Sequence, residues 1–119
     1  MANGLDLVPS GPKSTRAPRQ KMLRKVLLDH GGHIYNGTVR NISITGAMIE
    51  GLWNVPVNTV FELQLSRTMT ITCQTRWSED DRMGVQFATP LEKDKTGQII
   101  AIQEPAPKQI EPEELRKAS

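Results

Sequence analysis

Apolar and polar residues alternate through the middle of the chain. In residues 59–66, Phe61, Leu63 and Leu65 alternate with polar side chains, and residues 69–77 repeat this period of two. Successive side chains of a β-strand point to opposite faces, so this pattern predicts strands with one buried face. Shorter runs of similar character complete the set. The expected strands cover residues 22–30, 34–42, 47–50, 59–66, 69–77 and 83–87.

Turn-forming residues separate these strands. The run His-Gly-Gly-His at residues 30–33 is typical of a hairpin turn, and Asn36-Gly37 suggests a bulge within the second strand. Residues 51–58 predict a loop, and residues 78–81 predict a polar turn. Six short strands without a long helical pattern predict an all-β fold, a small six-stranded antiparallel barrel. Closure of the barrel would also remove exposed sheet edges.

The two ends of the chain differ in composition from this centre. Residues 1–21 are rich in proline, glycine and serine and carry arginines, which predicts a flexible basic leader. Residues 22–90 form the expected barrel, and residues 91–119 form a C-terminal helix or tail. Within that tail, residues 91–102 predict a short helix, whose isoleucines are available to pack on the barrel.

Composition limits the class of protein. A chain of 119 residues is one domain plus tails, and its single cysteine cannot form an internal disulfide, which fits a reducing cytoplasm. Residues 1–7 lack a basic region followed by an apolar run, so we expect no signal peptide. No stretch approaches 18 consecutive apolar residues, so we expect no membrane insertion.

Positive charge is concentrated at the front of the chain. The formal net charge of +2 is too small to indicate nucleic-acid binding by itself. Residues 1–25, however, hold six basic side chains against one acidic side chain, a net charge of +5. Two interpretations stay open: a solvated leader, or an electrostatic arm that closes on an anionic ligand.

Individual reactive residues favour structural roles. Cys73 alternates inward with Ile71 and is expected in the core, and Trp77 falls on the same core-facing side at the end of its strand. The two histidines at residues 30 and 33 have only Asp29 nearby, too few ligands for a metal site. Tyr35 and Trp53 are expected at a rim or on a loop. With no nucleophile–base pair and no convergent carboxylates, we expect neither an enzyme nor a cofactor.

Three short motifs contain the polar residues that are candidates for binding a ligand. A polar turn of the form Asn-x-Ser-x-x-Gly covers residues 41–46, and it follows a basic segment with Arg16 and Arg19. A later strand ends in Arg76-Trp77 and is followed by the run Arg-x-Gly-Val-x-Phe at residues 82–87. A guanidinium offers a planar fork of donors that matches phosphate oxygens or the O6/N7 edge of guanine. Together these motifs resemble the PilZ domain, a bacterial receptor module for cyclic di-GMP, over about residues 16–91.

The resemblance implies a ligand site and a mode of action. The leader side chains Arg16, Arg19 and Gln20 would bind the guanine and phosphate groups of cyclic di-GMP. The opposing wall would consist of Asn41, Ser43 and Gly46, with Lys21 and Trp77 at the periphery. Binding would order the leader and change the surface that is offered to a downstream protein.

Two other functions stay open. The PilZ pattern has two arginines four residues apart, whereas Arg16 and Arg19 are three apart. This spacing supports a PilZ-like adaptor that binds proteins and no nucleotide. Single-stranded nucleic acid is a weaker alternative, because such sites stack bases on exposed aromatic rings and Phe61, Phe87 and Trp77 are expected in the core.

Overall fold

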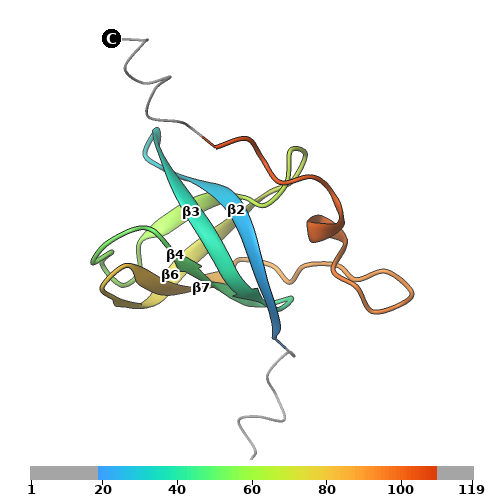
Figure 1. Ribbon diagram of the computed structural model, residues 1–119. Coiled ribbons are helices and arrows are strands. Elements are labelled where there is room, and N and C mark those ends of the chain that lie inside the picture. The colour runs from blue at the N-terminus through green and yellow to red at the C-terminus, as the bar shows by residue number, and fades with distance from the viewer. Residues whose placement is uncertain (1–18, 110–119) are drawn as a thin grey trace, which may run out of the picture.

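The structure is a closed antiparallel β-barrel (Figure 1). It is a computed structural model that describes residues 19–109, so Arg16 and most of the predicted leader lie outside the described residues. The barrel runs in the order β2-β3-β4-β7-β6-β5 and closes because β2 also pairs with β5. The elements are β2 (Gln20–His30), β3 (His33–Ile42), β4 (Gly46–Glu50), β5 (Val60–Gln64), β6 (Thr70–Glu79), β7 (Arg82–Phe87) and the 3-10 helix η1 (Ile100–Gln103).

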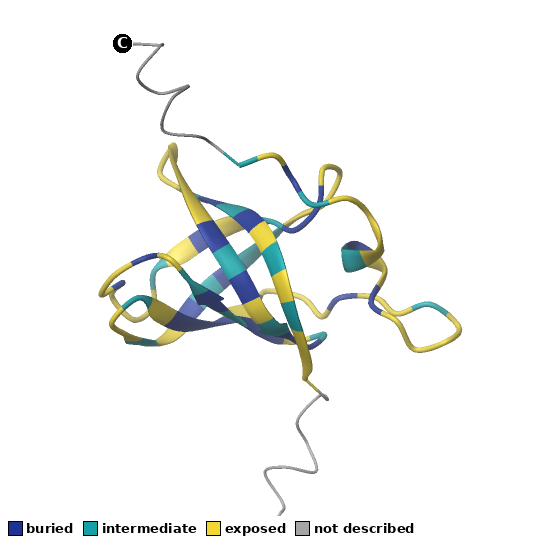
Figure 2. Cartoon of the chain, viewed as in Figure 1, coloured by how far each residue is buried: buried dark blue, intermediate teal, exposed yellow. Residues whose placement is uncertain are grey.

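This architecture confirms the predicted six-stranded barrel and its hairpins. Gly31 and Gly32 join β2 to β3 with φ angles of 59° and 90°, the left-handed conformations that a two-residue hairpin turn requires. Buried and exposed residues alternate along β2 and β3, as Figure 2 shows. The strand alternation in the sequence therefore reports directly on the two faces of the barrel wall.

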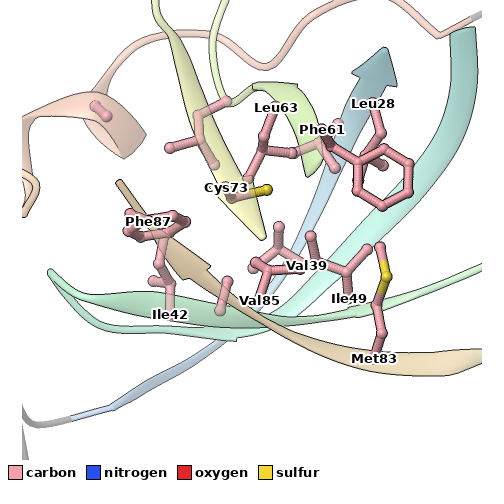
Figure 3. Close-up of a cluster of buried hydrophobic side chains, with 14 of the residues drawn as sticks. Leu28, Val39, Ile42, Ile49, Phe61, Leu63, Cys73, Met83, Val85 and Phe87 are labelled. Atoms are coloured by element: carbon pink, nitrogen blue, oxygen red, sulfur yellow. The ribbon is translucent and has the colours of Figure 1, made fainter. Parts of the chain in front are cut away.

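The barrel encloses one hydrophobic core. Figure 3 shows Cys73 among large apolar side chains, which include Phe61 and Leu63 of the neighbouring strand β5 and Phe87 of the neighbouring strand β7. Cys73 is 1% exposed, which confirms its predicted core position. Burial, together with the nearby charge of Glu62, raises the pKa of its thiol to about 12, so the sulfur stays protonated in the folded protein.

Irregular strand register corrects two predictions. The expected bulge at Asn36-Gly37 is wrong, because these residues pair with Leu27 and Val26 in unbroken register. The register shifts instead within β2, within β3 and between Thr75 and Trp77 of β6. The shift in β6 turns Trp77 to the outer face, where its side chain is 43% exposed. The expectation that Trp77 faces the core is therefore wrong.

The C-terminal segment packs on the barrel without forming the expected helix over residues 91–102. Only η1 is helical, because residues 94–98 turn around the carboxylate of Asp94, which accepts hydrogen bonds from the backbone N–H groups of Thr96 and Gln98. Gly97 takes the left-handed φ of 88° in this turn. The expected packing of isoleucines is present in part: Ile99 is buried in the core and Ile102 packs against it, whereas Ile100 is exposed.

One arginine holds the last described residues, 102–109, which we call the C-terminal strap. Arg24 of β2 donates from Nε to the carbonyl of Leu65 at 2.8 Å and from Nη1 to that of Ile102 at 3.3 Å, and its Nη2 donates to the carbonyl of Glu104. At the end of the strap, the side-chain amide of Gln109 donates to the β2 and β3 backbone. The strap is thus fastened to the barrel at both of its ends.

Candidate functional site

A side-chain hydrogen bond joins two of the sequence motifs. Arg19 donates from Nη1 to Oδ1 of Asn41 at 2.7 Å, although 22 residues separate them along the chain. The register of β2 and β3 places Lys21 directly opposite Asn41. Gln20 is the first residue of β2, so Gln20 and Lys21 belong to the barrel wall, and both are exposed. The structure therefore gathers Arg19, Gln20, Lys21 and Asn41 at one place.

Ser43 and Gly46 build the turn that follows Asn41. The backbone N–H of Ser43 donates to the carbonyl of Gly46 at 2.8 Å, while Oγ of Ser43 accepts from the N–H groups of Thr45 and Gly46. A methyl group at Gly46 would lie 2.4 Å from the carbonyl oxygen of Val85, so only glycine fits there. Both motif residues are buried. They shape the turn and present little surface of their own.

The same turn is anchored on two further sides. The backbone N–H of Phe87, at the end of β7, donates to the carbonyl of Thr45 at 2.8 Å. The N–H of Leu91 donates to the carbonyl of Ile44, also at 2.8 Å. Because these bonds hold the turn between β7 and the C-terminal segment, Asn41 projects from a fixed platform.

Strand register extends the site across the outer face of the barrel. Asn41 pairs with Met48, Met48 pairs with Gly84, and Gly84 pairs with Trp77. Directly paired residues of antiparallel strands share one face, and the neighbours of Met48 and Gly84 in their own strands are buried in the core. The outward-facing residues Lys21, Asn41, Met48, Gly84 and Trp77 therefore form a continuous line, which we call the outer row.

Trp77 ends the outer row with a flat ring that rests on glycine. A methyl group at Gly84 would lie 2.0 Å from Nε1 of Trp77, so the indole occupies the space that any other side chain would fill. Its exposed part is available for stacking, and stacking of a nucleic-acid base on an aromatic ring contributes about 1–3 kcal/mol. The Arg-Trp…Arg-x-Gly-Val-x-Phe pattern contains both partners, and their contact explains its glycine.

A charged cluster flanks the outer row. Arg40 and Arg82 both approach the carboxylate of Glu50, with N–O distances of 3.1 and 3.7 Å. With Lys21, they line a depression of about 390 Å³ beside Asn41 and Met48. Three cations against one anion leave this depression positive, which suits an anionic ligand.

Sequence reasoning did not identify Arg40 and Arg82 as site residues. Arg40 directly precedes the Asn-x-Ser-x-x-Gly turn, and Arg82 begins the Arg-x-Gly-Val-x-Phe run. Their places beside the two motifs were a usable signal. What the sequence could not show is that β4 and β7 are neighbours in the barrel, which brings Arg82 to Glu50. Arg40 reaches the same carboxylate across the β3–β4 pair.

The remaining candidates are accounted for within residues 19–109. Tyr35 and Trp53 are exposed aromatic residues, as expected. Nδ1 of His30 lies 3.0 Å from the carbonyl oxygen of Val60, and its ring packs against Phe61. No group of three or more histidine, cysteine or carboxylate side chains in the described part of the chain could hold a metal ion. In the same range, no helix has the length and hydropathy to cross a membrane.

One comparison with known proteins identifies a family that fits this geometry. The comparison with curated proteins found no match. The family model of the PilZ domain matches residues 14–102, three quarters of the chain, and this range contains every motif described above. The chain therefore belongs to the PilZ domain family.

Proposed function

We propose that this protein is a cyclic di-GMP receptor that changes conformation on binding and acts on a downstream protein in bacterial signalling. PilZ domains are in general receptors for this nucleotide. The observation that carries the proposal is the 2.7 Å hydrogen bond between Arg19 and Asn41. It joins the end of the leader to the Asn-x-Ser-x-x-Gly turn and lies beside a positive depression, and the outer row leads from it to the exposed ring of Trp77.

Each part of this surface has a partner in the ligand. Arg19, with Arg16 outside the described residues, offers a guanidinium for a phosphate or for the O6/N7 edge of guanine. Gln20 and Asn41 offer amides that can donate and accept at a base edge. Lys21 offers a charge for phosphate, and Trp77 a ring on which guanine can stack. Ser43 and Gly46 would contribute by fixing the turn.

The Arg19–Asn41 bond also suggests how binding changes the surface. In the free protein the Arg19 guanidinium bonds a neutral amide. A phosphate carries negative charge and can accept two parallel N–H bonds from the guanidinium, which a single amide oxygen cannot, so a ligand phosphate would compete well for Arg19. Arg19 would then turn toward the ligand, and the segment that precedes β2 would follow it. A downstream protein could read that change.

Calorimetric titration tests the proposal. We expect saturable binding of cyclic di-GMP and much weaker binding of GMP, which has the same base but half the phosphates. Amide spectra recorded during the titration should shift at residues 19–21, at Asn41 and at the indole N–H of Trp77. Shifts confined to other parts of the barrel would place the ligand elsewhere.

The second candidate is an adaptor that binds proteins and no nucleotide. The three-residue spacing of Arg16 and Arg19 favours it, because one arginine of the usual pair is replaced or displaced. A folded protein that takes up no cyclic di-GMP in the titration would establish this alternative. In either case we place the protein in the cytoplasm, which suits its single, buried cysteine.

A further inference from the structure

A second surface lies at the other end of β2, near the hairpin that joins β2 to β3. Here a depression of about 380 Å³ is lined mainly by ring-bearing side chains. We call it the aromatic pocket; its main lining residues are His30, Tyr35, Leu52, Trp53, Pro56 and Phe61. Trp53 is 68% exposed and Tyr35 is 41% exposed, so two large rings at this pocket face solvent.

The loop that carries Trp53 is fixed in place. Leu52 and Val55, on either side of Trp53 and Asn54, are buried in the core. The N–H groups of Gly51 and Asn54 each donate a 2.8 Å hydrogen bond to carbonyls of the β6–β7 turn. Figure 1 shows this loop, in green, beside the β6–β7 hairpin, in gold. The pocket is thus preformed, and the exposure of Trp53 is a consequence of the fold.

The β6–β7 turn gives the aromatic pocket an acidic border. Its carboxylates belong to Glu79, Asp80 and Asp81, and the carbonyls of the two aspartates bond the Trp53 loop. In the described range, both ion pairs of the neighbouring arginines use Glu50, and no cation lies within ion-pair distance of the three turn carboxylates. The border therefore stays negatively charged.

The barrel itself limits what can dock here. Each of its six strands has a neighbour on both sides, so no strand offers a full-length free edge for β-strand addition. We therefore look to side-chain contacts for recognition. Polyproline II segments dock in this way, because they are preformed, have no internal hydrogen bonds and pack on grooves lined by Trp, Tyr and Pro. The acidic turn adds a preference for lysine or arginine next to the prolines.

We propose that the aromatic pocket and the acidic turn dock an extended, proline-containing segment of a partner protein, with basic residues flanking the prolines. The prolines would pack between Tyr35 and Trp53, and the basic residues would face Asp80 and Asp81. This site is separate from the outer row and does not depend on nucleotide binding.

Synthetic peptides test the proposal on the full chain. The probe peptide has the core Pro-Pro-Leu-Pro-Pro followed by Arg-Lys, and the matched peptide ends in Glu-Glu instead. We expect the basic peptide to shift the amide signals of Tyr35, Trp53 and Asp80, and the acidic peptide to bind about tenfold more weakly or not at all. Equal binding of the two peptides, or no binding at millimolar concentration, would overturn the proposal.

Variants locate the contact. Trp53→Ala should weaken binding of the basic peptide about tenfold or more, since interface tryptophans dominate such contacts. Asp80→Asn should weaken it less, and asparagine tolerates the φ of 56° at this position, so the turn is kept. Leu23→Ala, at an exposed side chain in the first half of β2, is the matched control and should bind as the wild type does. A loss of binding in Leu23→Ala alone would refute the assignment, as would concentration-dependent shifts at Trp53 without peptide, which would indicate a second copy of the chain.

Discussion

At the scale of single residues, Gly84 shows how a missing side chain shapes the candidate site. The ring of Trp77 occupies the place where a methyl group would stand, at 2.0 Å from Nε1. We expect Gly84→Ala to lower the free energy of unfolding by about 1–3 kcal/mol, because the indole must leave its place. Urea denaturation measures this change.

The same substitution in a Trp77→Ala background isolates the contact. All three of the nearest atoms to the added methyl group belong to Trp77, so the cost of Gly84→Ala should largely vanish once the ring is removed. An equal cost in both backgrounds would mean that strand backbone, and not Trp77, excludes a side chain at Gly84. Gly46→Ala is a useful contrast, because the clash there is with the carbonyl of Val85 and should persist in either background.

Arg19 is the residue on which the proposed ligand site depends most. Arg19→Ala removes the guanidinium and its bond to Asn41. We expect cyclic di-GMP affinity to fall by about 1–3 kcal/mol, roughly ten- to a hundredfold, through loss of a bidentate contact. Calorimetry gives the affinity, and Arg67→Ala, at an exposed arginine of the β5–β6 loop, is the matched control. Unchanged affinity in a folded Arg19→Ala protein would remove Arg19 from the site and favour the adaptor.

Cys73 should make the stability of the folded protein depend on pH. Its folded-state pKa of about 12 lies above the ordinary value of 9.0, so between these values the unfolded state releases a proton that the folded state retains. Stability contributed by the protonated thiol is full below about pH 9 and is lost as pH rises toward 12. We expect a loss of about 1 kcal/mol at pH 10 relative to neutral pH.

Cys73→Ser separates this effect from other titrations. The variant should be less stable than the wild type at neutral pH, because a hydroxyl replaces a buried thiol. At pH 10 the difference in the free energy of unfolding between the two proteins should be smaller, because only the wild type has a thiol that ionises on unfolding. Denaturation of both proteins at both pH values measures this difference. Cyclic di-GMP affinity of the folded variant should be nearly unchanged, and loss of binding without loss of stability would contradict the core assignment.

At the scale of elements, Arg24 connects β2 to the C-terminal strap. Its guanidinium donates hydrogen bonds to the carbonyls of Leu65, Ile102 and Glu104. Arg24→Met keeps the apolar stem but leaves these carbonyls without that donor. We expect faster amide hydrogen exchange in residues 101–109 and at Arg67, whose N–H donates to the strap at Pro105, with little change in β3 and β4.

Lys25→Met, at the exposed neighbour of Arg24, is the matched control for this exchange experiment. It removes a positive charge from the same strand without touching the strap. If both variants exchange alike, net charge and not the Arg24 hydrogen bonds sets the stability of the strap.

The patterns in the sequence were sufficient to predict where the strands lie, but they were not sufficient to predict how the strands pair in register. Residues 59–66, 69–77 and 83–87 were predicted from a period of two and the other strands from apolar runs between turn signals, all with bounds within about two residues. A bulge adds one residue and reverses the facing of every later side chain, and its position depends on the partner strand. For this reason the outward turn of Trp77 after Thr75 was not predictable from β6 alone. The same local reasoning missed the turn around Asp94, whose side chain replaces helical hydrogen bonds.

The candidate site, like the strands, was predictable only in part. The two motifs indicated that Arg19 and Asn41 act together, and β2–β3 pairing brings them into contact. The hydroxyl of Ser43 accepts hydrogen bonds within the turn, and its contact with a ligand stays a prediction. Arg82 joins the site only through the order of β4 and β7 in the barrel, which no local pattern contains. Arg40 stands directly before Asn41 and meets Glu50 across the β3–β4 pair.

At the scale of the whole molecule, the two proposed surfaces differ in charge and in place. The outer row borders a positive depression near the start of β2, and the aromatic pocket borders an acidic turn near its end. Along β2 the two surfaces are one strand length apart, since the strand has 11 residues, about 36 Å at 3.3 Å per residue. They come closest at the β6–β7 hairpin, where Trp77 of the outer row stands three residues before Asp80. A ligand held near Lys21 and Asn41 would therefore leave the aromatic pocket free.

Because positive charge is concentrated on the proposed nucleotide side of the molecule, the salt dependence of cyclic di-GMP affinity tests the binding mode of the whole molecule. Residues 1–25 carry a net charge of +5, and Lys21, Arg40 and Arg82 line the depression, so attraction of a dianionic ligand should be screened by added ions. We expect cyclic di-GMP affinity to fall steadily as sodium chloride rises from low to high concentration in calorimetric titrations. Arg19→Ala, with one charge fewer, should show a weaker dependence. Affinity that is independent of salt would mean that stacking on Trp77 and neutral hydrogen bonds hold the ligand, and that the basic leader has little part in binding it.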